Sequence, residues 1–199
     1  MFESIALLSG FISLVWITIG VIVAAKFYPN YCHYNQFCSE LGAAASPTEK
    51  LSPLINNYPL GALFCLFGWS ITQQFDDSIL FSVVGWLIIV HGVGTWVAGF
   101  FPMDRDPYTK TPSVHCQIHS WAGFIMLISL LIAPLLVAFS HLPFEFRIFS
   151  IACAVIAVYF LVKMAKSFKQ RQNVGLYQRL SYWAKLVWLA GLSLLLWST

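Results

Sequence analysis

Two histidines four residues apart, His115 and His119, have the spacing that best suits metal chemistry in this sequence. If a helix begins near Ser113, both imidazoles lie on one helix face, where they can ligate one metal ion as in helical zinc sites. Asp104 lies on the same side of the membrane and is the candidate third ligand. In the alternative interpretation the histidines are interfacial residues hydrogen-bonded to loop carbonyls. The pattern thus predicts zinc held by His115, His119 and Asp104, and no other cofactor.

Ser39, Glu40 and Asp104 are the candidate catalytic residues beside this metal site. Asp104 would ligate the metal, act as general base or orient a histidine, and Ser39 with Glu40 would position substrate or water. Each residue also has a structural alternative. Asp104 would pair with Arg105 or cap a helix, and Ser39 would cap a short helix that Gly42 ends.

His91 and Lys185 are ionisable residues within apolar segments. An imidazole at that depth is costly unless it faces the bundle interior, so His91 is a functional candidate that would ligate haem, relay protons or bind a headgroup. Alternatively it is a neutral histidine bonded to a neighbouring helix, among glycines that favour close packing. Lys185 is expected to snorkel to the nearby interface.

Membrane-spanning helices must position these residues. Of the 199 residues 59% are hydrophobic and only 10% are charged, with a mean hydropathy of +0.75. Soluble domains carry about 25% charged residues, so most of this surface must face lipid. A spanning helix needs about 20 apolar residues. The prediction is an all-α, polytopic membrane helix bundle in a single domain, residues 1–199, with about six helices at 5–27, 55–75, 78–101, 115–139, 142–165 and 177–197.

Basic residues crowd one side of this predicted bundle. The loop between the fifth and sixth helices is rich in Lys and Arg, while the opposite side carries Arg147, Asp76 and Asp77. The positive-inside rule then predicts cytoplasmic long loops and non-cytoplasmic termini, in a plasma or bacterial inner membrane. Because no basic tract or basic-aromatic stripe is present, nucleic acid is excluded as a partner, and membrane lipids are the expected partners.

Three motifs follow in order along the chain. They are Ser39-Glu40-Leu41-Gly42, Phe101-Pro102-Met103-Asp104 and His115-x-x-x-His119. Together they resemble a bacterial family of multi-pass membrane proteins known as domain of unknown function 998 (DUF998), over nearly the whole chain. In that family a "SxLG" segment, an "FPxD" segment and a histidine pair recur at similar places. This resemblance implies a multi-pass fold and carries no established activity.

A weaker likeness is to hydrolases of the alkaline ceramidase and adiponectin-receptor type. The serine, aspartate and histidine pair on one membrane face are similar to their pattern, which implies zinc and hydrolysis. Those proteins hold zinc with three histidines in a seven-helix bundle. This chain has six expected spans and one histidine pair, so the third histidine would have to be His33 or His91.

Three functions are consistent with these residues. The first is a membrane-embedded, metal-dependent lipid hydrolase with its site at the cytoplasmic face, which requires Ser39, Asp104, His115 and His119 to converge. The second is a transporter or binding protein for lipid or a small hydrophobic molecule, with a cavity that reaches the bundle midplane past His91. The third is a structural or regulatory membrane protein, whose polar residues satisfy one another without an open cleft.

Overall fold

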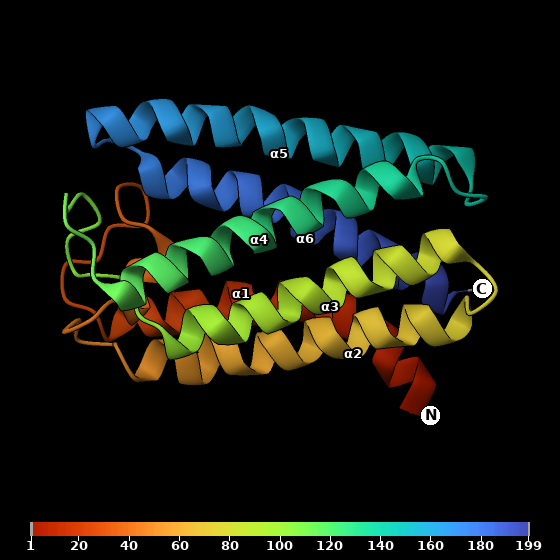
Figure 1. Ribbon diagram of the computed structural model, residues 1–199, viewed down its shortest axis with the longest axis horizontal. Coiled ribbons are helices and arrows are strands. Elements are labelled where there is room, and N and C mark those ends of the chain that lie inside the picture. Colours follow the sequence, from red (N-terminus) through yellow and green to blue (C-terminus); the bar gives the residue numbers. More distant parts are fainter. Residues whose placement is uncertain (1, 199) are drawn as a thin grey trace.

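Six long helices form the computed structural model of the protein, which describes residues 2–198 (Figure 1). Each is long and apolar enough to cross a membrane, and the described residues contain no strand. The predicted six-helix, all-α bundle is confirmed, and the chain is a multi-pass membrane protein. The helices are α1 (Phe2–Lys26), α2 (Tyr58–Gln74), α3 (Ile79–Phe100), α4 (Val114–Val137), α5 (Phe144–Gln170) and α6 (Val174–Trp197).

Two spans differ from their expected bounds for local reasons. A π-helical turn, η2 (Pro53–Asn57), leads directly into α2, and Pro53 fits there because the first turn needs no N–H. α5 extends to Gln170 instead of ending near 165, since its lysines favour helix while they reach into water. Arg171 ends α5 in the left-handed conformation, with φ 55°. A short 3₁₀ helix, η1 (Cys38–Gly42), lies in the first loop.

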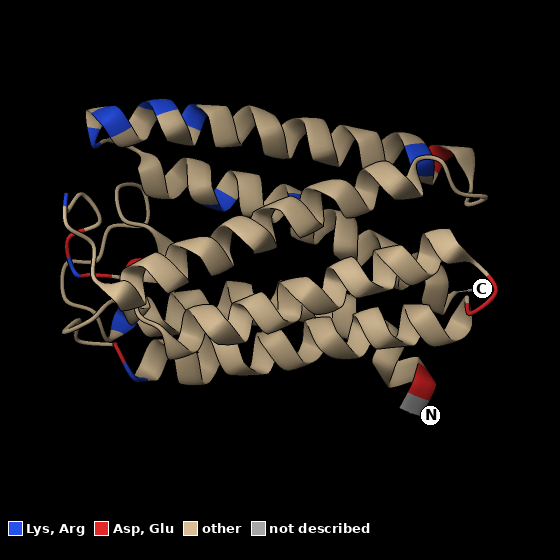
Figure 2. Cartoon of the chain, viewed as in Figure 1, with Lys and Arg blue, Asp and Glu red and all other residues tan. Residues whose placement is uncertain are grey.

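Consecutive helices run antiparallel, so the connections alternate between two ends of the bundle (Figure 1). We call one of them the loop end; it carries the two long connections and the short α5–α6 turn, and the opposite end carries both termini and the other two connections. Most Lys and Arg residues lie at the loop end (Figure 2). The positive-inside rule predicts that this end faces the cytoplasm. The loop end comprises residues 27–57, 101–113 and 171–173.

The helices form a ring in chain order. α1 packs on α2, α2 on α3, and α3 on α4, while α5 packs on α6 and α6 on α1. α4 and α5 close the ring with fewer contacts than any of these pairs. The α4–α5 side, here called the seam, is therefore the least tightly packed side of the ring.

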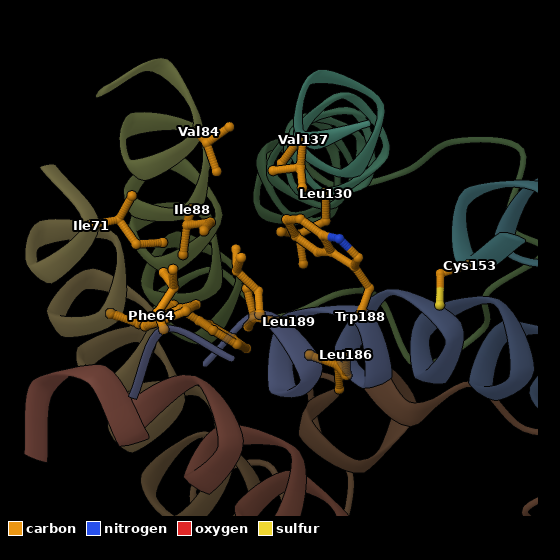
Figure 3. Close-up of a cluster of buried hydrophobic side chains, with 14 of the residues drawn as sticks. Phe64, Ile71, Val84, Ile88, Leu130, Val137, Cys153, Leu186, Trp188 and Leu189 are labelled. Carbon is orange, nitrogen blue, oxygen red and sulfur yellow. The ribbon is translucent and has the colours of Figure 1, made fainter. Parts of the chain in front are cut away.

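The apolar core lies mostly in the half of the ring away from the loop end, and Figure 3 shows some of its side chains in close-up. α2 contributes side chains from Leu60 to Ile71, α3 contributes its first half, α4 its last turns and α6, the most buried span, its second half. Trp188 on α6 is fully buried, and its indole N–H donates to the Ser150 hydroxyl at 3.0 Å. Large side chains fill this half, whereas the cavity described below lies towards the loop end.

Glycines bring α2 and α3 close together. A Cβ added at Gly68 would lie 2.5 Å from the Gly85 carbonyl oxygen, and one at Gly92 would lie 2.7 Å from the Cys65 sulfur. Small residues at such crossings let membrane helices approach closely. The expected role of the glycines near His91 in close helix packing is confirmed.

A Gly68→Ala variant should therefore unfold more easily. The added methyl group meets backbone and must push the two helices apart, which we expect to cost about 1–3 kcal/mol. Gly123→Ala on α4 is the matched control, because a Cβ there would meet no atom within 4 Å. Thermal unfolding in detergent, followed by circular dichroism, should show a lower midpoint for Gly68→Ala alone. Equal midpoints would contradict the close α2–α3 crossing.

Candidate functional site

A cavity of about 570 Å³ lies inside the ring at the loop end. Residues of all six helices line it, and the first and third loops cover it. Its volume falls within the range of about 300–1,000 Å³ that is typical of small-molecule sites. Its deepest polar side chains are those of His91, Thr95, Tyr182 and Lys185. The cavity therefore reaches the middle of the bundle past His91.

One face of α6 forms the polar wall of the cavity. Gln178, Ser181, Tyr182 and Lys185 all line it, at positions i, i+3, i+4 and i+7. This spacing places them on a single helix face. Of these four residues, only Lys185 is a candidate from the sequence. The available signal was a polar stripe at helical spacing within an otherwise apolar segment.

Lys185 lies near the middle of α6, about 16 Å of helix from Val174, and is 5% exposed. Among the described residues, neither a hydrogen bond nor an ion pair reaches its amine, whose contact is the Tyr182 ring, 5.4 Å from Nζ. The expectation that Lys185 snorkels to the interface is wrong, because the side chain lies in the cavity wall. A lysine at the centre of a membrane helix costs about 2.5–3.5 kcal/mol on insertion scales, which makes it a functional candidate.

His91 is fully buried and bonded on both sides of its ring. Nδ1 lies 2.9 Å from the Met126 carbonyl oxygen on α4, and Nε2 lies 3.2 Å from the Tyr182 hydroxyl on α6. Because a carbonyl only accepts, Nδ1 carries the proton and Nε2 accepts from Tyr182. His91 is thus a neutral histidine bonded to neighbouring helices, as its alternative interpretation expects. Neither ring nitrogen is available to a haem iron.

His119 lies at the cavity wall near the loop end. Its Nδ1 lies 3.0 Å from the Ala98 carbonyl oxygen and 2.9 Å from that of Phe101. Nδ1 must donate to these carbonyls, so Nε2 is the nitrogen that can accept a hydrogen bond or bind a metal. These bonds to carbonyls at the end of α3 resemble, for His119, the hydrogen-bonded alternative considered for the histidine pair.

The three sequence motifs meet over the cavity. The Ala44 N–H, just after Gly42, donates to the Met103 carbonyl at 2.9 Å, and Ala43 and Met103 pack against Cys116 in a small buried cluster. These contacts join the first loop, the third loop and the start of α4. The motifs therefore form one roof, although they are far apart in sequence.

Asp104 fixes the third loop to α4. Its carboxylate accepts the Ser113 backbone N–H at 2.8 Å, and the Ser113 hydroxyl accepts from the Cys116 N–H and so caps the helix. Hydrogen bonds from the Ser113 side chain and backbone hold the pKa of Asp104 below its usual value. Asp104 therefore holds the loop at the start of α4, where Ser113 is the capping residue, and its predicted metal and catalytic roles stay predictions.

Glu40 stabilises the fold of the first loop. Its two carboxylate oxygens accept hydrogen bonds from the Phe37 N–H at 2.8 Å and from the Gln36 amide at 3.1 Å. Glu40, rather than Ser39, therefore closes the first turn of η1. This leaves the Ser39 side chain at the cavity wall.

The guanidinium of Arg179 holds the first loop onto α6. Nη1 donates to the carbonyls of Gln36 at 2.8 Å and of His33, while Nη2 donates to the Tyr31 hydroxyl at 2.6 Å. The loop approaches α6 so closely that a Cβ at Gly175 would lie 2.0 Å from the Gln36 carbonyl oxygen. Burial dominates the titration of the loop side chains here, raising the pKa of Tyr31 and lowering that of His33.

The structure brings together only part of the predicted site. Ser39 and His119 both line the cavity, whereas Glu40, Asp104 and His115 lie outside it. Within residues 2–198, no group of three or more His, Cys, Asp or Glu side chains is placed to hold a metal ion. The predicted zinc site of His115, His119 and Asp104 therefore gains no support from the geometry and stays a prediction.

The cavity approaches the lipid-facing surface beside α4. Ser120 and Phe124 line both the cavity and a shallow outer groove that includes Trp121, which is 66% exposed. On the other side of the seam, Leu161 and Met164 of α5 line the cavity. The wall at the seam is therefore largely apolar and adjoins the bilayer.

A family model described as "Protein of unknown function (DUF998)" matches residues 11–195 of the chain. This match covers all six helices and the three motifs. No curated protein and no solved structure matches the chain.

If Arg179 holds the roof in place, an Arg179→Lys variant should loosen the first loop. Lysine cannot make the forked set of hydrogen bonds, and a loss of about 1.4 kcal/mol corresponds to tenfold faster exchange. Hydrogen–deuterium exchange of residues 31–42 should therefore rise by about tenfold.

Arg171→Lys is the control for this change. Arg171 lies over the Tyr108 ring, 4.5 Å from its centroid, at the end of α5. Exchange of residues 31–42 should stay at the wild-type rate in this variant. An equal effect of the two substitutions would contradict the role assigned to Arg179.

Proposed function

The chain belongs to the DUF998 family, and we propose that it binds a lipid-like molecule within its helix ring, as a membrane binding protein or transporter. The observation that carries this proposal is the cavity of about 570 Å³, which extends from the loop-end roof to His91 and Lys185 in the middle of the bundle. Ligand sites in helix bundles are built in this way from side chains on facing helices. A purely structural protein would be expected to fill this space with side chains.

The bilayer is the proposed source of the ligand. The seam is the least tightly packed side of the ring, and apart from Ser120 the residues that line the cavity there are apolar on both α4 and α5. The roof, by contrast, is tied to α6 by Arg179 and to α4 by Asp104. Lateral entry through the seam lets an apolar chain reach the cavity without crossing water or unfolding the roof.

A metal-dependent lipid hydrolase is the second candidate, since Ser39 and His119 line the same cavity. The hydrolase would need a metal held by His119 with ligands other than its predicted partners, and a general base other than Asp104. Zinc at one equivalent per chain, lost in a His119→Ala variant that still folds, would favour it over a binding protein.

Filling the cavity should abolish binding. Gly123 lines the cavity and a Cβ there would meet no atom within 4 Å, so Gly123→Phe places a ring in the open space without a backbone clash. The probe is a pyrene-labelled long-chain alcohol, whose saturable binding is followed by energy transfer from the tryptophans of detergent-purified protein. We expect at least a tenfold loss of affinity.

Ile128→Phe is the matched control, because it adds the same ring to α4 at a position that is 38% exposed and lies outside the cavity lining. Its affinity for the alcohol should equal that of the wild type. If Gly123→Phe binds as well as Ile128→Phe, the ligand does not occupy this cavity and the proposal fails.

A further inference from the structure

The charges of the cavity wall are all of one sign. Lys185 and Arg179 line the cavity, and none of the described lining residues is Asp or Glu. Arg179 uses its Nη atoms on loop carbonyls and on Tyr31. The Lys185 amine has no protein partner among the described residues, although it is 95% buried (5% exposed). Neither cation has a carboxylate partner among the described residues, and Lys185 is the one whose amine donates no hydrogen bond to the protein.

Hydrogen-bond donors deep in the cavity are otherwise already in use. The hydroxyls of Thr95 and Ser181 donate to the carbonyls of His91 and Ala157, each at 2.8 Å. The Tyr182 hydroxyl donates to His91 Nε2, as the ring tautomer requires. A ligand that reaches this depth thus finds the Lys185 amine as its available donor. Such a donor prefers an ionised acceptor, because charge-assisted hydrogen bonds are about twice as strong as neutral ones.

The walls also differ in polarity across the cavity. α6 supplies the polar stripe that ends at Lys185. α4 and α5 face it mostly with apolar side chains that continue to the seam, and the polar α4 residues of the lining, His119 and Ser120, lie nearer the loop end. A molecule that satisfies both walls has a charged end at α6 and a hydrocarbon chain directed towards the bilayer. The apolar lining on that side comprises Phe124, Leu127, Leu161, Met164 and Phe168.

We infer that the cavity takes an anionic amphiphile, with its carboxylate or phosphate at the Lys185 amine and its chain directed towards the α4–α5 seam. This inference rests on the proposed function and names the ligand class of the same cavity. The anion neutralises a buried cation, which explains why α6 carries a lysine where a membrane helix would otherwise avoid one. A carboxylate and a phosphate both supply the ionised oxygen acceptor that the Lys185 amine requires.

Three pyrene-labelled probes with the same chain test the headgroup, one ending in an alcohol, one in a carboxylate and one in a phosphate monoester. The wild type should bind at least one anionic probe ten times more tightly than the alcohol. In Lys185→Met, of similar shape but without charge, the ratio of the anionic-probe affinity to the alcohol affinity should fall to about one. Lys185→Arg, which keeps the charge, should keep the preference.

Lys163→Met on α5 is the control, because it removes a cation whose contact is the Tyr159 ring, outside the cavity. It should keep the wild-type preference. Equal affinities of the wild type for all three probes would overturn the inference and leave the proposed function standing. If no probe binds saturably, both the inference and the proposed function are overturned. If acetate or inorganic phosphate alone displaces the bound anionic probe, Lys185 binds a small anion, and the inference of an anionic amphiphile is overturned.

Discussion

The hydrogen bonds from Arg179 to the first loop are the interaction on which the loop end depends. One guanidinium satisfies carbonyls and a hydroxyl of a segment that has little regular structure of its own. With that loop held on α6, the Ala44–Met103 hydrogen bond and the small buried cluster bring the third loop and α4 into the same roof. The cavity exists because this roof covers a ring whose large apolar side chains are concentrated in the opposite half.

Beneath that roof, α6 is both deeply buried in the bundle and polar on one face, a combination that is costly in a membrane. It is the most buried span, yet one of its faces is a polar stripe. His91 and Tyr182 satisfy each other across the ring, so their polarity is compensated within the protein. Lys185 is not compensated by any described side chain. In a medium of low dielectric such a group needs a counter-charge, and an anionic molecule within the ring is the partner we assign to it.

Much of the fold could be predicted from the sequence, because the length and apolarity of a span are local properties. The helix start at Ser113 follows from an equally local rule, and the cost of an unpaired imidazole in the membrane predicts that His91 bonds to a neighbouring helix without saying which one. The polar stripe of α6 could not be assigned to a cavity, since the inward face of a helix depends on its neighbours in the ring. The roles of Glu40 and Asp104 likewise depend on loop folding, which long-range contacts such as those of Arg179 decide.

Native mass spectrometry of the protein released directly from its own membrane would show whether the ring holds an anionic amphiphile there. Once the bound molecules dissociate and are identified, we expect one predominant adduct per chain that carries a carboxylate or phosphate and a hydrocarbon chain. A bare chain, or a mixture of adducts that mirrors the bulk lipid composition, would contradict this expectation.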